Sequence, residues 1–496
     1  MFAGCGRHDA RRATAAHTPR PQPSVSPAPP WSQPARRDLQ QTLSGIFTSR
    51  LARDRTGIAV VSGDGTELFG RHATRPVAPA STLKLLVAAS ALDALGPGYR
   101  FETRFAASAP MMGGTLAGPL WLVGGGDPTL TSRDLSGGVG ALRTAGLREI
   151  AGALDIDATA FAGPEQNPHW DPTDLDEEYA AGTSAISLDS DVVDFVVRPG
   201  NVGDAARVRT DPRNLAIDWH GSIRTAPGGA GTLVSIERSP VVSPLPGPTP
   251  LAPAAAAPPQ TTYDLDGHIE AGIEQNYFKP ILGVPGYAGG AVAAMLADRG
   301  IGLAGGWATA PTPLGAVTLW SHRSRPLVDI VHVMLVESDN HFAETLLRML
   351  GEGDGRAGTD AGGIAFERSE LAKLGVRYRR LTLYDGSGLA PSDRVEPIML
   401  ARLLSAAARM AAGNAFVADL PRVGIEGTVK HHDLHAALGR TRAKSGHIAG
   451  VNGLAGYVTT MHHGRIAFAF VVNDVDANED VIYTEEDAAL DALARM

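Results

Sequence analysis

The sequence predicts an α/β (α+β) fold in which an antiparallel sheet packs against helices and a mostly β insertion interrupts the chain. Residues 83–95 are apolar on nearly every side and stop at a Gly-Pro pair, which is typical of a buried helix. Apolar residues in 325–337 recur at i, i+3, i+4, i+7 and i+8, the period of a helix with one face in the core. Residues 453–461 and 465–473 flank a short turn and are rich in Val, Ile, Phe and Tyr, which predicts a β-hairpin.

The two ends of the chain differ in pattern. Residues 1–37 are rich in Pro, Ala and Arg without an apolar period, so we expect a disordered tether. Apolar residues sharing one face predict a helix from Asp38, and 57–61 with 66–69 read as a hairpin. A last helix is expected to begin at Thr484, with a capping box.

Between the ends, the pattern predicts a divided domain. Residues 38–100 together with 268–496 are expected to form one α/β domain, and 101–267 to form the insertion. Short strands and Gly/Pro turns in the insertion suggest one or two mostly β lobes. Its Pro/Ala-rich stretch 239–260 can be neither strand nor helix and is expected to be a mobile loop.

Composition excludes several functions. The net charge is -9 over 496 residues and there is no basic cluster, which argues against nucleic acid as a partner. With Cys5 as the one cysteine, there is neither an internal disulfide nor a cysteine-based metal site. No H-E-x-x-H accompanies the clustered histidines, so loop and turn positions are favoured over metal binding. Neither a P-loop nor a G-x-S-x-G string is present.

Three short strings carry the chemistry, and the first is Ser81-Thr82-Leu83-Lys84. Residues three apart on a helix lie on one face, so Ser81 and Lys84 can touch. A serine hydroxyl is a weak nucleophile until an adjacent base takes its proton. Lysine is a base only when neutral, which needs a pKa well below about 10.4, and burial or a second cation such as Lys444 lowers it. The pattern leaves open whether Lys84 is the base or holds a hydrogen bond while another base works.

The second string is Ser338-Asp339-Asn340, between the helix predicted over 325–337 and another predicted over 342–350. A loop between two packed helices holds its side chains rigidly. A hydroxyl and an amide placed there suit proton relay by Ser338 and recognition of a peptide backbone by Asn340. These residue types also cap helices, so capping of the following helix is the alternative interpretation.

The third string, Lys444-Ser445-Gly446, precedes the predicted C-terminal hairpin and so belongs on or beside a sheet-edge strand. There Lys444 can attract a carboxylate, and Ser445 adds a hydroxyl donor. The backbone amide of His447, just past Gly446, can pair with the amide of Ser81 as an oxyanion hole. The His447 side chain is not required for that role.

The strings S-x-x-K, S-D-N and K-T-G mark penicillin-binding proteins and class A β-lactamases, and Ser445 in place of Thr is the one departure here. From about residue 38 to the C-terminus, the chain resembles more closely the penicillin-binding protein 4 family of D-alanyl-D-alanine carboxypeptidases and endopeptidases, peptidase family S13. The long gap between the first two strings is typical of that family. Four further stretches carry the resemblance: LWLVGGGDPTLT (120–131), YAAGTSAISLDSDVVDFVVRPG (179–200), YDGSGLA (384–390) and GHIAGVNGLAGY (446–457).

The resemblance implies a penicillin-binding transpeptidase-like domain with serine D,D-peptidase activity. Its expected partners are peptidoglycan stem peptides and β-lactam antibiotics, with no cofactor and no metal. Ser81 would attack the carbonyl of the penultimate D-Ala, and water would release the acyl-enzyme. Whether the insertion binds the polymeric substrate or is a spacer stays open.

Two alternatives belong to other classes. A β-lactamase-like hydrolase would deacylate fast, but in class A this needs a glutamate on an E-x-x-L-N string, which the sequence lacks. A non-catalytic cell-wall-binding module would normally have lost at least one of Ser81, Lys84 and Lys444, and all three are present.

Localisation is inferred from the substrate, which lies outside the cytoplasm. The sequence has no run of about 18 apolar residues and no signal-peptide core at its start. Phe2-Ala3-Gly4-Cys5 resembles the end of a lipoprotein signal. We therefore expect an extracytoplasmic protein whose export signal is missing from the given N-terminus and is encoded from an upstream start.

Overall fold

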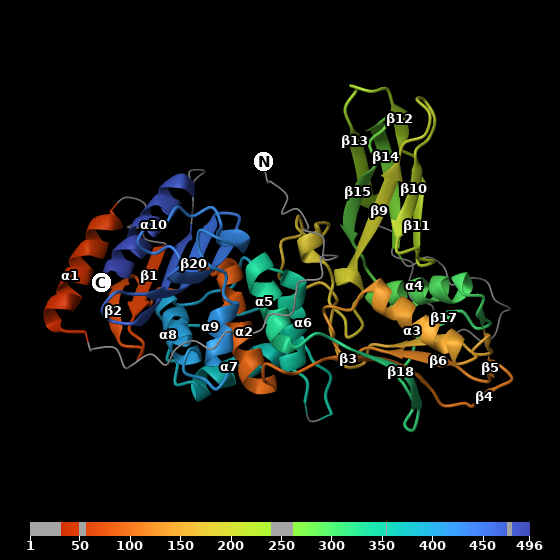
Figure 1. Ribbon diagram of the computed structural model, residues 1–496, viewed down its shortest axis with the longest axis horizontal. Coiled ribbons are helices and arrows are strands. Elements are labelled where there is room, and N and C mark those ends of the chain that lie inside the picture. The colour runs from red at the N-terminus through yellow and green to blue at the C-terminus, as the bar shows by residue number, and fades with distance from the viewer. Residues whose placement is uncertain (1–30, 49–55, 240–260, 354, 474–478) are drawn as a thin grey trace.

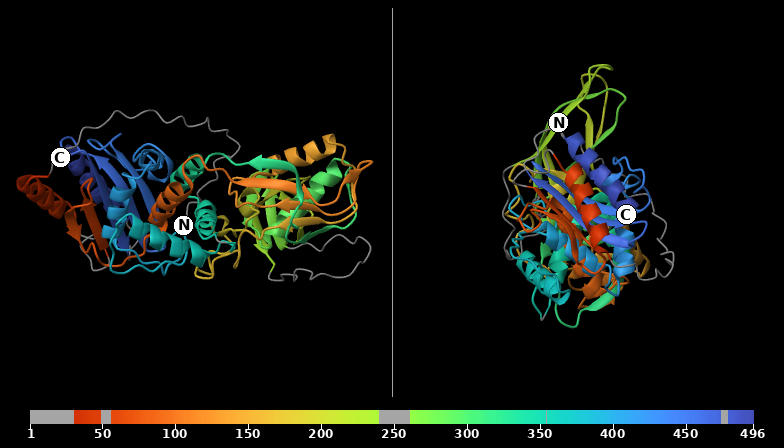
Figure 2. Two further views of the ribbon diagram at one scale, coloured as in Figure 1. Left: turned by 90° about the horizontal axis from the view of Figure 1, so that it is seen from below. Right: turned by 90° about the vertical axis from the view of Figure 1, so that its left-hand side faces the viewer.

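The computed structural model describes residues 31–48, 56–239, 261–353, 355–473 and 479–496. It has the mixed α/β architecture predicted from the sequence, with two regions that lie side by side along the longest axis (Figures 1 and 2). Most of the predicted tether and almost all of the Pro-rich stretch 239–260 fall outside the described residues.

A five-stranded antiparallel sheet organises the first region. Its strand order is β19-β20-β21-β1-β2, so the N-terminal hairpin pairs with the C-terminal strands. Both predicted hairpins are confirmed. The strands are β1 (Thr56–Val61), β2 (Glu67–Arg71), β19 (Thr441–Ile448), β20 (Val451–Thr459) and β21 (Arg465–Asn473).

The two faces of this sheet are packed differently. Because successive side chains of a strand point to opposite faces, Phe468 and Phe470 of β21 lie on one face and Ala467 and Ala469 on the other. The large side chains meet α1 and α10, whereas the small ones let α8 approach closely. The first region is thus a three-layer αβα arrangement (Figure 1). Its helices are α1 (Gln33–Ile46), α2 (Lys84–Leu95), α5 (Leu327–Glu337), α6 (Asn340–Leu350), α7 (Asp360–Lys373), α8 (Pro397–Ala407), α9 (Gly413–Asp419) and α10 (Glu479–Arg495), with 3-10 turns η1 (Ala80–Leu83) and η4 (Gly427–Val429).

Two predicted helix starts are wrong. Helix α1 begins at Gln33, inside the expected tether, because Ser32 accepts a hydrogen bond from the amide of Ala35 and a proline occupies the first turn. Helix α10 begins at Glu479, so Thr484 lies inside it and donates to the carbonyl of Asp480. The predicted capping box does not form, because Asp487 instead bonds to His432 and to the amide of Asp433 in a neighbouring loop.

The second region extends further along the chain than the predicted insertion. Strand β18 pairs with β3, and α4 packs in the same core as the strands around it, so residues 268–323 belong here and not with the sheet described above. The sequence carries no boundary signal between residues 267 and 268, because the strand pattern continues across this position. The strands are β3 (Glu102–Ala107), β4 (Met111–Met112), β5 (Thr115–Leu116), β6 (Leu120–Val123), β7 (Glu149–Ile150), β8 (Leu154–Asp157), β9 (Val192–Arg198), β10 (Arg207–Asp211), β11 (Ile217–Gly221), β12 (Arg224–Ala226), β13 (Leu233–Arg238), β14 (Thr261–Glu270), β15 (Gln275–Pro280), β16 (Gly302–Leu303), β17 (Trp307–Thr309) and β18 (Val317–Arg323).

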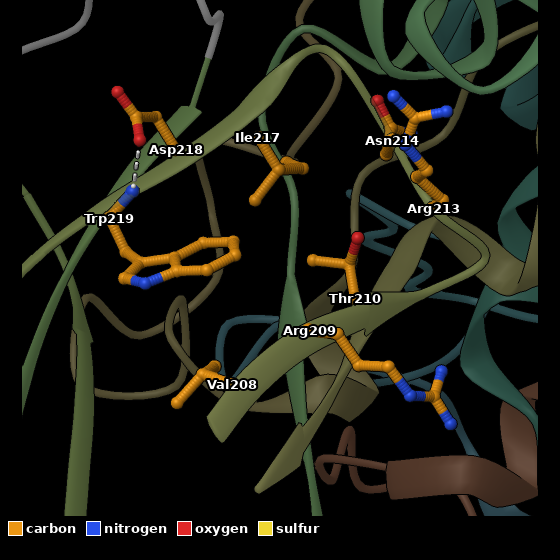
Figure 3. A pocket seen from close by; sticks show the side chains of 8 residues that line it. All are labelled: Val208, Arg209, Thr210, Arg213, Asn214, Ile217, Asp218 and Trp219. Carbon is orange, nitrogen blue, oxygen red and sulfur yellow. Dashed lines mark hydrogen bonds between the residues drawn. The ribbon is translucent and has the colours of Figure 1, made fainter. Parts of the chain in front are cut away.

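Among its described residues, this region has four small sheets and two α-helices, α3 (Ser132–Thr144) and α4 (Val284–Asp298). The strand orders are β17-β8-β6-β3-β18, β16-β7-β5-β4, β10-β9-β15 and β11-β14-β12, with β13 also paired to β14. Helices α3 and α4 lie together over the first of these sheets, and the other strands project beside them (Figure 1). A hollow of about 440 Å³ lies between β10 and β11, where Trp219, Ile217 and Arg209 line it (Figure 3).

Arg348 of α6 links the two regions. Its guanidinium is almost fully buried and donates to the Asp360 carboxylate at 2.6 Å, to the Thr183 carbonyl at 2.8 Å and to the Pro164 carbonyl at 2.6 Å. Pro164 and Thr183 belong to the segment between β8 and β9. The planar fork of arginine satisfies all three acceptors at once, which lysine cannot do.

We predict that Arg348→Met lowers the free energy of unfolding by about 3–5 kcal/mol, because it removes the charged partner of the partly buried Asp360 carboxylate and the donor to the Pro164 and Thr183 carbonyls. The matched control is Arg213→Met, since Arg213 pairs with Asp298 at 2.7 Å but both side chains are more than half exposed. That loss should be about 0–1 kcal/mol. Urea unfolding of the three proteins measures both values, and equal losses would contradict the assignment of Arg348 as the link.

Candidate active site

Ser81 and Lys84 are in contact, as the sequence predicts. Ser81 lies on η1, and Lys84 begins the buried helix α2 that continues from it. The Lys84 Nζ atom donates to the Ser81 Oγ atom at 2.8 Å. Lys84 is fully buried, whereas Ser81 is partly exposed, so the hydroxyl is accessible while the amine behind it is not.

The turn that carries Ser81 is held under strain. Ala80, just before it, has φ +47°, a left-handed conformation that costs a non-glycine residue about 1–2 kcal/mol. Gly388 packs directly against it, and a Cβ at that glycine would lie 2.0 Å from the Ala80 carbonyl oxygen. Such strain persists only where the surroundings over-determine it, and it concentrates at functional sites.

Three acceptors surround the Lys84 ammonium. Besides Ser81 Oγ, they are the Asn340 Oδ1 atom at 2.7 Å and the Ser387 carbonyl at 2.9 Å. Burial lowers the pKa of Lys84 to about 8, although the charges of Asp385, Glu344 and Asp339 act in the opposite direction. Burial, one of the two causes expected from the sequence, is the largest cause of the shift, and a contribution of Lys444 stays a prediction.

The second string lies in the link between α5 and α6. Ser338 ends α5 in a left-handed conformation and is partly exposed. Asp339 caps α6 by accepting from the amide of Phe342, so the capping interpretation holds for this residue. Asn340 instead turns its side chain to the site, where it accepts from Lys84 and donates to the Tyr179 carbonyl at 2.8 Å. Proton relay by Ser338 stays a prediction.

The third string lies on β19, at the edge of the five-stranded sheet. Gly446 allows this strand to lie against η1, because a Cβ there would be 2.9 Å from the amide nitrogens of Ser81 and Thr82. Lys444 is fully buried, and its Nζ donates to the Ser445 carbonyl at 2.6 Å. The Ser445 hydroxyl is hydrogen-bonded to that of Thr428 at 2.6 Å. The side chain of His447 is exposed, and the role of its amide in an oxyanion hole stays a prediction.

The site contains residues that the motif analysis did not assign. Ser387 supplies a carbonyl, and Glu344 and Asp385 are buried carboxylates close to Lys84. Asp385 and Ser387 belong to YDGSGLA (384–390), which resembles the S13 family but has no chemical role predicted from the sequence. Its two glycines around a serine were the available signal, since such a loop brings backbone groups close to a partner.

Within the parts of the chain that the structure describes, no set of three His, Cys, Asp or Glu side chains is arranged to hold a metal ion. Among the same residues, none of the helices combines the length and the apolar character needed to cross a bilayer.

Comparisons with known proteins cover all three strings. The family model described as D-Ala-D-Ala carboxypeptidase 3 (S13) matches residues 39–232 and 261–495. The D-alanyl-D-alanine carboxypeptidase of Actinomadura sp. (strain R39) is 31% identical over 490 residues, which cover 94% of this chain and 88% of that protein. The carboxypeptidase DacB of Haemophilus influenzae is 24% identical over 406 residues, 79% of this chain and 80% of that protein. The crystal structure of penicillin-binding protein 4 from H. influenzae superposes with a TM-score of 0.75 at 21% identity, covering 92% of this chain and 99% of that one.

We predict that Lys84 titrates near pH 8, because its ammonium is desolvated. Lysine labelled with ¹³C at the ε position gives few signals, since the chain's lysines are Lys84, Lys279, Lys373, Lys430 and Lys444. Lys373 is the internal control, because its hydrogen bond to Asp93 raises the pKa of that lysine. Loss of one signal in Lys84→Arg assigns the resonance. A Lys84 midpoint at or above about 10.4 would show that burial does not neutralise it.

Proposed function

Because the chain belongs to the D-Ala-D-Ala carboxypeptidase 3 (S13) family and is a serine-type carboxypeptidase, we propose that it cleaves peptidoglycan stem peptides through an acyl-enzyme on Ser81. One observation carries the assignment of the nucleophile. The buried Lys84 amine is 2.8 Å from the Ser81 hydroxyl, and its lowered pKa allows it to be neutral near physiological pH. A serine is activated in this way only when a base is within hydrogen-bond reach.

The reaction follows from the positions of the groups. Neutral Lys84 takes the Ser81 proton as Oγ attacks the carbonyl of the penultimate D-Ala. Strand β19 runs beside Ser81, which supports the amides of Ser81 and His447 as the two donors to the oxyanion. The leaving amine receives a proton through Ser338, and water then releases the acyl group.

Substrate binding is assigned to the edge strand and the second string. Lys444 and Ser445 on β19 would attract the C-terminal carboxylate of the stem peptide. The close approach of Gly446 to η1 supports this, because it brings that strand alongside the nucleophile. Asn340 would bind the peptide backbone by exchanging its Tyr179 partner for substrate, while its oxygen stays with Lys84.

β-Lactams are expected to acylate Ser81, since their strained amide resembles the D-Ala-D-Ala bond. Hydrolysis of the adduct as in a β-lactamase is the weaker alternative. Glu344 is the acid near Lys84, but both its oxygens accept from the amide of Gly386 and one also from that of Ser387. A carboxylate engaged by the backbone is poorly placed to activate water, which supports a long-lived adduct. A non-catalytic module is disfavoured by the intact contact of Ser81 and Lys84.

The same chemistry extends to cross-links, where a diamino acid is the leaving group in place of D-Ala. Digestion of purified sacculi, with mass spectrometry of the released fragments, distinguishes endopeptidase from carboxypeptidase action. The substrate also sets the place of action, which we assign to the outside of the cytoplasmic membrane.

Labelled penicillin should add covalently at Ser81 and not at Ser338 or Ser387, because only Ser81 has the amine of Lys84 within reach of its hydroxyl. Peptide mapping after incubation locates the adduct. Ser81→Ala should stay folded and unlabelled, and Lys84→Arg should lose acylation because arginine stays protonated. An adduct elsewhere, or none with folded wild-type protein, would refute the proposed function.

Ser445→Ala should weaken cleavage of peptides with a free C-terminal carboxylate by about 1–3 kcal/mol, the contribution of a hydrogen bond to a charged group. Ser445→Thr retains the hydroxyl and should be nearly neutral. The measurement is kcat/KM on paired peptides with free and amidated C-termini. Equal loss on both peptides would show that Ser445 does not bind the carboxylate.

A further inference from the structure

The third acceptor of Lys84 is a backbone group, and the structure shows what fixes it. The Ser387 carbonyl lies in the irregular loop 384–390, where no strand or helix sets the orientation of the peptide plane. A peptide plane in such a loop must be held by side chains or by neighbouring backbone.

Asp385 holds this plane. The carbonyl of Ser387 and the amide of Gly388 belong to one planar peptide unit and point in opposite directions. The Gly388 amide donates to Asp385 Oδ1 at 2.7 Å, while the carbonyl accepts from Lys84 on the other side. The carboxylate therefore fixes the direction of the Ser387 carbonyl, which accepts a hydrogen bond from Lys84. Hydrogen bonds joined through one peptide also polarise each other.

The other Asp385 oxygen ties the loop together and to the second region. Oδ2 accepts from the amide of Ala390 at 2.7 Å and from the indole of Trp170 at 2.9 Å, with a longer contact from the Ser387 hydroxyl at 3.3 Å. Trp170 is buried and lies in the segment between β8 and β9. Asp385 thus joins that segment to the peptide that holds Lys84.

Glu344 of α6 holds the loop from the opposite end, through the amides of Gly386 and Ser387. Asp385 and Glu344 are fully or almost fully buried, and both face Lys84 together with Asp339. Glu367 and Asp393 are also buried close to Asp385, and burial raises the pKa of each well above its usual value. Burial likewise raises the pKa of Glu344, to about 8.

We propose that Asp385 is a positioning residue for the reaction: it orients the Ser387–Gly388 peptide, which holds the Lys84 amine against Ser81, and it couples this arrangement to Trp170. The inference rests on the proposed function. It has a second consequence, because among the charges that raise the Lys84 pKa that of Asp385 is the largest. Removing it should release the amine from its geometry and also make the amine easier to deprotonate.

The test is the rate of acylation by penicillin per active site, measured over a range of pH. The active sites are counted from the amount of penicillin that each protein finally binds. Asp385→Asn should lower the plateau about 10- to 100-fold, the cost of misplacing a reacting group by about 1 Å. The pH range in which the acylation rate of this variant rises, the acidic limb, should lie lower than in the wild type, since the Lys84 pKa falls. A merely structural defect reduces the number of active sites and moves neither quantity.

Glu367→Gln is the matched control, because Glu367 is as deeply buried near Asp385 but is not among the charges that shift the Lys84 pKa. It should leave the plateau rate constant within about twofold of the wild type and the acidic limb unmoved. Trp170→Phe removes only the indole donor to Asp385 and should lower the plateau while keeping the fold. If Asp385→Asn does not fold, Trp170→Phe decides, and a wild-type plateau in that variant overturns the proposal. The proposal is also overturned if the acylation rate of Asp385→Asn depends on pH as in the wild type. It is overturned as well if Glu367→Gln shifts the acidic limb as far as Asp385→Asn does. A wild type that penicillin does not acylate would instead refute the proposed function.

Discussion

Burial of the Lys84 ammonium is the constraint on which the site depends. A lysine removed from water needs an acceptor for each of its three N–H groups, and here they are a hydroxyl, a side-chain amide and a backbone carbonyl from three distant parts of the chain. Desolvation lowers its pKa, which is the property that the proposed role of Lys84 as a base requires. That burial also requires the surrounding loops to be held in place.

Close backbone packing meets that requirement. Gly446 brings β19 against η1, and Gly388 brings the 384–390 loop against Ala80 from another side. Ser81 lies on the turn between them, preceded by a residue in a strained conformation that this packing maintains. Two buried carboxylates, Glu344 and Asp385, satisfy the amides of the loop. The Ser81 turn, which carries the proposed nucleophile, is thus held by two glycines and two acids.

The second region supplies contacts that hold parts of the site. Its segment between β8 and β9 reaches α6 through Arg348, reaches Asn340 through the Tyr179 carbonyl and reaches Asp385 through Trp170. Two of these contacts end beside Lys84, because Asn340 accepts from its amine and Asp385 holds the peptide whose carbonyl does so. An inserted region anchored in this way is part of the architecture of the site, whichever role its outer sheets have with a polymeric substrate.

The sequence by itself determined the three strings, the contact of Ser81 with Lys84, the sheet-edge position of Lys444 and both hairpins of the central sheet. These follow from local periodicity and spacing, which are readable along the chain. Tertiary structure alone decided the rest. The assignment of residues 268–323 to the second region depends on the pairing of β18 with β3. The contacts of the Ser387 carbonyl with Lys84 and of Asp385 with Trp170 join residues hundreds of positions apart. Such contacts have no periodic signature, because they are set by how packed elements meet.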